Sequence, residues 1–469
     1  MRATRESVRR SVRLRPHVQR TLRRRSLRAS IAEGVVAELV GACASGGAIT
    51  AWALYLGLTP VLVGVLGALP FAAQVVQIPS AWLTRIHGNR RTALWTIGVS
   101  RQLPLVLVAL PWLPVPEPAQ RAILLAVAAA SALLAVAGNN AWTSWMGDLV
   151  PDRIRGRYFG RRTAFCALGS TLGALAAGLA LDHARPGQGA GLVLSLLAFA
   201  SCAFGAATVL LLARQHEPPH LVAPEPTLQD ALRPWTEPFA RRALTFHVMW
   251  AAASGLSAAF YPIHMIANLR MGFACMALYN GTIAAARMLT SPLWGRAVDR
   301  VGARPVLVAC CFGLCFSPFL WLIVREDLLW PLAFDAAACG VLLAGQGLAS
   351  FSLPLNLSSR GSRPFHLAAF AAAGGVATGV ASVAGGALAH LLPVQWAFLG
   401  RPVVSAQLLF LIGGTGLRFC AAALALRIVE PGARPVQALG RLALDGALRR
   451  SRVEPRRALA TVERRSSAA

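Results

Sequence analysis

Long apolar stretches recur along the whole chain, and short polar or Arg-containing segments separate them. A helix needs about 20 predominantly apolar residues to cross a bilayer. By this measure the sequence predicts six membrane-spanning helices in each half, near residues 31–57, 59–84, 92–113, 121–146, 163–183, 190–213, 243–267, 272–297, 305–325, 329–356, 365–392 and 404–428. We therefore expect an all-α membrane protein with about 12 transmembrane helices in two six-helix bundles.

One long polar segment divides the two sets of helices. Residues 214–242 contain six prolines among Glu and His residues, and such a segment cannot form a continuous helix. The expected domains are a basic tail (1–30), a first bundle (31–213), a linker (214–242), a second bundle (243–428) and a second basic tail (429–469). Because many spans follow the first one, residues 1–30 are interpreted as a retained tail rather than a cleaved leader.

Composition and charge agree with a bilayer as the solvent. Of the 469 residues, 56% are hydrophobic and 14% charged, and the net charge is +27. The basic residues gather in the two tails and in alternate loops, near residues 85–91, 153–162, 300–304 and 360–363. Since cytoplasmic loops carry the excess of positive charge, both termini and the linker are predicted to be cytoplasmic, in a plasma membrane and most simply a bacterial inner membrane. The tails are interpreted as lying against an anionic leaflet rather than binding nucleic acid.

The sequence contains no sign of catalysis, metal binding or a cofactor. The nine cysteines lie in apolar stretches without a C-x-x-C spacing, which indicates small buried side chains. The chain has no Lys, so it cannot carry a phosphate-binding loop of the G-K-[ST] type, and it has no H-E-x-x-H or G-x-S-x-G segment. We expect neither an enzyme nor a cofactor.

The two halves also match in detail. Three residues around the loop between the second and third helix recur 214 positions later, and three around the fourth helix recur 207 positions later: Gly88, Arg90 and Pro104 match Gly302, Arg304 and Pro318, and Gly138, Asn139 and Arg153 match Gly345, Gln346 and Arg360. Two parallel halves would enclose a shared cavity, and rocking of one half against the other would give alternating access.

The segment from Gly295 to Arg304, GRAVDRVGAR, resembles the loop signature of the major facilitator superfamily. The first-half loop departs from the signature, because Ala81 and Arg85 stand where Gly and Asp are expected. The loop from Gly147 to Gly160 is also similar to the connection between the fourth and fifth helices in bacterial members of this superfamily. The resemblance implies a carrier, by default a monomer, with a cytoplasmic gate formed by Gly295, Asp299, Arg300, Gly302, Arg304, Gly88, Arg90, Asp148 and Arg153.

Small residues along the fifth helix resemble the antiporter motif of that superfamily. Gly169, Gly173 and Gly178 have the expected spacing, and Gly385 follows a similar pattern in the eleventh helix. Such ladders are more often plain helix packing. Efflux is therefore only slightly favoured over uptake.

Charged and polar residues inside the predicted spans are the candidates for function, because a charge in the bilayer is costly. Glu38 and Asp335 are the candidates for proton coupling, with pairing to a nearby Arg as an equal alternative. Arg101 and Arg287 could bind an anionic substrate or balance these carboxylates, and for Arg101 structural pairing is the preferred interpretation. The expected substrate path consists of polar and aromatic residues: Gln74, Gln77, Asn139, Asn140, Trp142, Tyr261, His264, Asn280, Arg287 and Gln346.

Together these observations predict a secondary carrier of a small solute in the lipid bilayer, coupled most simply to protons. The alternative is a transport-inactive relative that acts as a membrane sensor, scaffold or assembly factor. The sequence does not identify the substrate.

Overall fold

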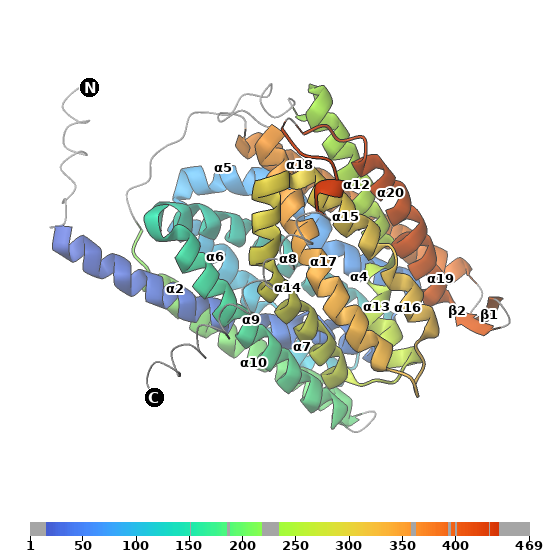
Figure 1. The fold of residues 1–469 in the computed structure, drawn as a ribbon. Coiled ribbons are helices and arrows are strands. Elements are labelled where there is room, and N and C mark those ends of the chain that lie inside the picture. The colour runs from blue at the N-terminus through green and yellow to red at the C-terminus, as the bar shows by residue number, and fades with distance from the viewer. Residues whose placement is uncertain are drawn as a thin grey trace, which may run out of the picture. The chain divides into compact units, whose positions relative to one another are not determined.

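A computed structural model describes residues 16–150, 152–184, 188–217, 234–357, 363–392, 395–398, 401–430 and 432–439. The first half is a series of long helices, several of them interrupted (Figure 1). They are α2 (Pro16–Ala44), α3 (Gly47–Tyr55), α4 (Pro60–Ala72), the 3-10 helix η1 (Ala73–Val76), α5 (Gln77–His87), α6 (Asn89–Gln102), α7 (Leu105–Ala109), η2 (Leu110–Trp112), α8 (Glu117–Leu149), α9 (Asp152–Asp182) and α10 (Gln188–Ala213).

The second half repeats this order and adds a hairpin. It contains α12 (Pro238–Ala258), α13 (Phe260–Ile263), the π-helix η3 (His264–Asn268), α14 (Phe273–Val301), α15 (Ala303–Leu314), α16 (Ser317–Ile323), α17 (Trp330–Leu357), α18 (Arg363–Leu391), β1 (Gln395–Phe398), β2 (Arg401–Val404), α19 (Ser405–Leu409), the π-helix η4 (Phe410–Leu417) and α20 (Arg418–Ala425). The two strands are antiparallel, with Gln395 opposite Val404.

Each of the twelve predicted spans falls on helical structure, so the prediction of an α-helical membrane protein is confirmed. Ten helices in the described residues are long and apolar enough to cross a bilayer, and Pro60–Val76 is a shorter apolar helix. The remaining span lies in α14, which is 29 residues long but less apolar, because it carries Asn280 and Arg287. Large apolar side chains such as Leu210 and Val380 are 62% and 66% exposed. This exposure suits a surface that faces lipid.

Several boundaries differ from the sequence-based expectation. α2 begins at Pro16, well inside the segment expected to be a tail. The second span breaks at η1, shortly after Pro70, because a proline inside a helix removes a backbone hydrogen bond. The hairpin β1–β2 was not predicted; it occupies the short connection between the last two spans.

The chain forms two compact units. Unit 1 comprises residues 1–225 together with 259–281, and unit 2 comprises residues 226–258 and 282–469. The segment 259–281 thus belongs to the second half by sequence but packs with the first. In particular, Asp182 at the end of α9 accepts hydrogen bonds from the backbone N–H groups of Phe273 and Ala274, at 2.6 and 2.8 Å.

Small residues allow the first and fifth helices of each half to pack closely. In unit 1, Gly169 and Gly173 of α9 face Val35 and Leu39 of α2, and a Cβ at either glycine would lie within 3.0 Å of those side chains. In unit 2, Gly385 of α18 lies directly against the backbone of α12. The glycine ladders therefore serve helix packing, which was the more ordinary interpretation of the pattern.

Candidate functional site

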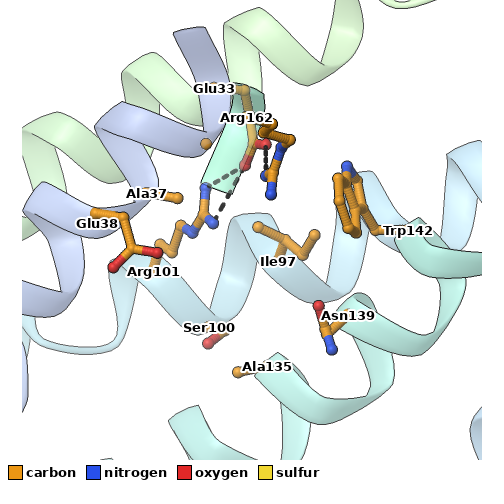
Figure 2. A pocket seen from close by; sticks show the side chains of 11 residues that line it. Glu33, Ala37, Glu38, Ile97, Ser100, Arg101, Ala135, Asn139, Trp142 and Arg162 are labelled. Atoms are coloured by element: carbon orange, nitrogen blue, oxygen red, sulfur yellow. Dashed lines mark hydrogen bonds and ion pairs between the residues drawn. The ribbon is translucent and has the colours of Figure 1, made fainter. Parts of the chain in front are cut away.

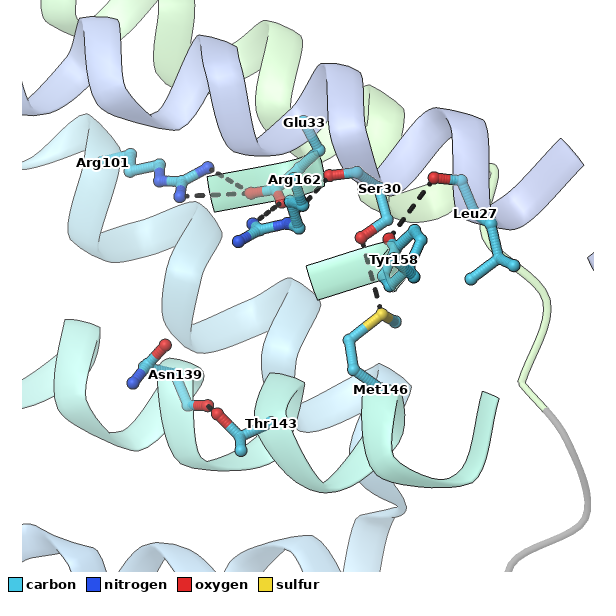
Figure 3. A network of polar contacts seen from close by, with 9 residues as sticks. All are labelled: Leu27, Ser30, Glu33, Arg101, Asn139, Thr143, Met146, Tyr158 and Arg162. Carbon is cyan, nitrogen blue, oxygen red and sulfur yellow. Dashed lines mark hydrogen bonds and ion pairs between the residues drawn. The ribbon is translucent and has the colours of Figure 1, made fainter. Parts of the chain in front are cut away.

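A buried carboxylate joins three helices inside unit 1. Glu33 of α2 forms ion pairs with Arg101 of α6 and Arg162 of α9, with N–O distances of 3.4 and 3.3 Å. The Glu33 side chain is 3% exposed, whereas those of Arg101 and Arg162 are 17% and 19% exposed. Figure 3 shows the carboxylate between the two guanidinium groups.

Neighbouring contacts hold Arg162 and its helix in place. Arg162 Nε donates to the carbonyl of Ser30 at 3.3 Å, and the guanidinium lies over the ring of Trp142, 4.3 Å from its centroid. One turn earlier, the Tyr158 hydroxyl donates to the carbonyl of Leu27 at 3.4 Å. These bonds tie α9 to α2, and the stacked ring ties it to α8.

Ion pairing explains why this charge cluster is tolerated inside an apolar bundle. A buried charge is tolerated when it is paired and hydrogen-bonded. Here one carboxylate serves two guanidinium groups, so the three residues together carry one excess positive charge. The pair Arg121–Glu117 differs in its surroundings, because Glu117 is 77% exposed.

The charge cluster opens on a polar pocket of about 280 Å³ (Figure 2). Its lining combines charged, amide and aromatic side chains: Glu33, Gly34, Ala37, Glu38, Ile97, Ser100, Arg101, Ala135, Asn139, Trp142 and Arg162. Glu38 is half-buried and forms no hydrogen bond or ion pair with any described residue. It is thus the acidic side chain of the pocket that keeps its oxygens available.

A larger apolar cavity of about 550 Å³ adjoins the polar pocket. The two share four lining residues, Ala37, Ser100, Arg101 and Ala135. The walls of the larger cavity come mostly from aliphatic side chains and glycines of α2, α3, α4, α6, α7 and α8, including Ile49, Leu66, Leu107, Leu124 and Val127. All of these residues belong to unit 1. The combined volume is in the range of small-molecule sites.

The loop between the second and third helix of each half is anchored in the same way. Gly88 has φ +83° and directly precedes α6. Two residues later, Arg90 donates its backbone N–H to Glu217 at 3.0 Å and its Nη2 to the carbonyl of Ala213 at 2.7 Å.

The second half repeats every part of this anchor. Gly302 has φ +97° and directly precedes α15, and Arg304 donates its backbone N–H to Glu430 at 2.7 Å and its Nη2 to the carbonyl of Leu426 at 2.8 Å. We call these two sets the loop anchors. They confirm that the Gly and Arg matches in the sequence mark equivalent structure.

Comparison with known proteins agrees with this duplicated helical architecture. The family model described as Major Facilitator Superfamily matches residues 35–288 and 256–413. The chain belongs to this superfamily. Among curated protein sequences no match is found.

Solved structures of transporters in this fold resemble the chain along most of its length. A variant of the nucleoside transporter NupG shares 13% identity and a TM-score of 0.64, covering 85% of this chain and 100% of that one. The D-xylose-proton symporter shares 13% identity and a TM-score of 0.63, covering 87% and 99%. At such identities the likeness shows the fold alone.

Within this superfamily fold, the residues of the expected substrate path separate into groups. Asn139 and Trp142 line the polar pocket. Gln77 donates to Gln74 at 2.6 Å, and Asn140 donates to the Gln77 carbonyl at 3.1 Å, so these three meet at the junction of η1, α5 and α8, outside both cavities.

The other members of the expected path lie farther along the chain. Tyr261 is half-buried in α13, and His264 is buried, with Nδ1 at 2.9 Å from Asn268 Nδ2. Asn280 donates to the Met276 carbonyl of its own helix at 3.1 Å. In unit 2, Arg287 is exposed and Gln346 donates to Ser350 at 3.1 Å.

Asp335 has a different environment from Glu38. It is fully buried in α17 and accepts hydrogen bonds from the Ser317 hydroxyl at 2.7 Å and from Trp321 Nε1 at 3.1 Å. The Cys339 thiol approaches it at 3.6 Å. These neutral donors come from α16 and α17, so Asp335 fastens two helices of unit 2 together.

Only some residues of the superfamily loop signature pack against other helices. Gly295 packs near Leu348, while Asp299 and Arg300 are exposed at the end of α14. Asp299 forms no hydrogen bond or ion pair with any described residue. The side chains of Asp148 and Arg153 lie outside the described residues.

Four residues of these sites were not among the sequence candidates: Glu33, Arg162, Glu217 and Glu430. A signal for the last two exists in the sequence, because Glu217-Pro218 and Glu430-Pro431 are Glu-Pro pairs at equivalent positions after the sixth and twelfth helices. Glu33 and Arg162 lie at the polar ends of their predicted spans. A charged residue is common at such an end, so the sequence gives no signal that these two pair inside the bundle.

Proposed function

We propose that this membrane protein is a secondary active transporter that moves a small solute by alternating access and couples the movement to protons. The observation that carries the proposal is the polar pocket of unit 1, in which the unpartnered Glu38 faces a cluster of fixed charges next to a large apolar cavity. A solute site beside an exchangeable carboxylate is what a proton-coupled carrier requires.

Glu38 is the preferred coupling group for a geometric reason. A carboxylate that binds and releases a proton in each cycle needs access to the pocket and freedom from permanent ion pairs. Glu38 meets both conditions, whereas Glu33 is held by two guanidinium groups. Asp335 is a second candidate, but its bonds to Ser317 and Trp321 favour a structural role.

The substrate path starts, in this proposal, from the two pocket-lining residues Asn139 and Trp142. Residues farther from the pocket would contact the solute at other stages of the cycle: Gln74, Gln77, Asn140, Tyr261, His264, Asn280, Arg287 and Gln346. The loop anchors, with Gly295, Asp299, Arg300, Asp148 and Arg153, would form the cytoplasmic gate.

We further propose that the protein lies in a bacterial inner membrane as a monomer, with both termini in the cytoplasm; the Arg-rich loops support this orientation. The sequence slightly favours efflux over uptake through the glycine ladder of α9.

The alternative function is that of a transport-inactive sensor, scaffold or assembly factor. The intact anchor of the first half speaks against the loss of carrier geometry on which that alternative rests.

A flux experiment tests the proposal. The purified chain is reconstituted in liposomes that contain a pH-sensitive dye, and a panel of organic acids, sugars, nucleosides and amphiphilic drugs is added from one side. We expect at least one solute to trigger proton movement, and the sign of the pH change with each orientation gives the direction of transport. The Glu38→Gln variant should retain its fold and lose the proton movement.

Two further variants make the result specific. Glu117→Gln changes an exposed carboxylate of α8 outside both cavities, and it should leave the flux unchanged. Asp335→Asn should lower stability and leave coupling intact. Silence of the folded wild-type protein across the panel would contradict transport and favour the sensor or scaffold alternative.

A further inference from the structure

The polar pocket of unit 1 has more positive charge and more hydrogen-bond donors than its buried partners use. Glu33 pairs with both Arg101 and Arg162, so this cluster has one positive charge more than its carboxylate balances. Glu38 lines the same pocket but forms no ion pair with either guanidinium group. When Glu38 carries a proton, the pocket therefore keeps one positive charge without a counterion among the described residues.

Specific donors in the pocket lining also lack acceptors. Arg101 uses Nη1 and Nη2 for Glu33, and Arg162 uses Nε and Nη2 for Ser30 and Glu33. Arg101 Nε and Arg162 Nη1 donate to no described residue. The indole Nε1 of Trp142 is buried and likewise has no acceptor among the described residues. A buried donor without a partner, such as the indole N–H of Trp142, destabilises the empty pocket, and an incoming acceptor would remove that cost.

The space beside these donors has a different character. The adjoining cavity of about 550 Å³ is lined mostly by aliphatic side chains and glycines, and it begins at Arg101 and Ser100, which belong to both cavities. A molecule that fills both would thus present an acceptor-rich head to the guanidinium groups and an apolar body to Leu107, Leu124 and Val127. Guanidinium groups suit carboxylates because their N–H donors match the two oxygens.

We propose that the solute is an organic anion, a carboxylate with an apolar body. Its acid group binds at Arg101, Arg162 and the Trp142 indole N–H, and its body occupies the apolar cavity. This inference rests on the proposed transport function and specifies its substrate class. An anion next to ionised Glu38 is repelled, so occupancy of the pocket by the anion favours the protonated form of Glu38, and solute and proton become linked.

A binding series on the wild-type protein tests this class without relying on any variant. The full-length chain in nanodiscs is titrated with three ligands of nearly the same shape: 2-naphthoate, 2-naphthamide and 2-naphthylmethylammonium. We expect the anion to bind at least tenfold more tightly than the neutral amide or the cation. Equal or tighter binding of the amide or the cation, or no binding of any of the three to folded protein, would overturn the proposal.

Variants then locate the site. Trp142→Phe keeps a ring beneath Arg162 but removes the unpartnered N–H, and it should weaken naphthoate binding several-fold. Arg101→Gln should abolish the preference for the anion; a circular dichroism and gel-filtration check shows whether this variant folds. Arg121→Gln removes a guanidinium that lines neither cavity and should bind naphthoate like the wild type. Equal affinity of wild type, Trp142→Phe and folded Arg101→Gln would place the anion elsewhere and contradict the inference.

The results distinguish failure of the proposed substrate class from failure of the proposed transport function. If naphthoate binds to the pocket but triggers no movement across liposomes, the site is correct and the proposed transport is wrong. If sugars or nucleosides drive proton flux while naphthoate does not bind, the transport proposal holds and the substrate class is wrong.

Discussion

The two halves of this protein share a scaffold and differ in their interiors. Both loop anchors use a glycine with positive φ, an Arg two residues later and a Glu a few residues after the sixth or twelfth helix, with N–O distances of 3.0 and 2.7 Å to the anchored N–H. Even the Nε atoms of Arg90 and Arg304 are alike, since both are buried without an acceptor among the described residues.

The two buried acidic residues outside the anchors, by contrast, differ in their surroundings from one unit to the other. Glu33 of unit 1 binds two guanidinium groups beside a cavity, while Asp335 of unit 2 binds neutral donors within a closely packed pair of helices. The duplicated elements are thus those that hold each bundle together at its loops. The elements that differ lie in the interiors of the bundles, and the one in unit 1 lines the pocket that we propose as the solute site.

The largest effect is expected from Glu33→Ala, which would leave two guanidinium groups in an apolar interior without their counterion. Breaking a buried ion pair by removing one partner costs about 3–5 kcal/mol. Unfolding in SDS, or the yield of monodisperse protein where the variant is too unstable to titrate, measures the loss. Glu117→Ala removes an exposed carboxylate instead and should cost less than about 1 kcal/mol. Equal losses from both would show that the cluster contributes no special stability.

Replacing either anchor glycine, Gly88 or Gly302, with alanine should give the next largest loss of stability. The size of the loss should differ between the two halves. Both adopt positive φ with ψ near 155–165°, a region open essentially to glycine, where other residues cost about 1–3 kcal/mol. A Cβ at Gly302 would also lie 2.8 Å from Ala433 Cβ, whereas one at Gly88 would meet only Glu217 Oε1 at 3.6 Å. Melting temperatures in detergent should therefore fall for both alanine variants, and further for Gly302→Ala.

Much of this scaffold could be predicted from the sequence. Apolar runs of bilayer length leave little choice but membrane helices, so the twelve spans were found. The matches of Gly88 with Gly302 and of Arg90 with Arg304 marked the anchors, because a glycine that begins a helix after a turn is demanded by backbone geometry. The helix interruptions at η1, η3 and η4 and the hairpin β1–β2 depend on packing that no local pattern records.

The interior could be predicted only in part. Arg101 was correctly interpreted as a structural partner of a carboxylate, but the partner is Glu33 rather than Glu38. Glu33 is the third residue of the predicted span 31–57, whereas α2 begins at Pro16 and places it well inside a helix. Which of two acidic residues five positions apart meets an Arg of another helix is decided by helix rotation and side-chain reach, and one sequence does not contain that information.

Exchange of the anchoring carboxylates should have a smaller effect than the glycine changes. Glu217→Gln and Glu430→Gln keep an oxygen that can accept from the N–H of Arg90 or Arg304 but remove the charge near a helix N-terminus, which is worth about 0.3–1 kcal/mol. Because Glu430 is buried and Glu217 is only half-buried, the loss should be larger for Glu430→Gln. SDS unfolding of the two single variants measures the difference; identical losses would show that burial does not distinguish the anchors.

The smallest effect on stability is expected for Asp299→Asn, although Asp299 belongs to the loop signature that first indicated the family. Its side chain is exposed and forms no hydrogen bond or ion pair with any described residue, so the free energy of unfolding should change by less than about 0.5 kcal/mol. If Asp299 acts in the proposed gate, the variant should slow solute-driven proton flux at unchanged stability, since a gating contact formed in only part of the cycle affects rates rather than the resting fold. A loss of stability as large as that of Glu430→Gln would instead make Asp299 a fourth member of the second-half anchor, beside Gly302, Arg304 and Glu430, and the two halves would then differ in their scaffold as well as in their interiors.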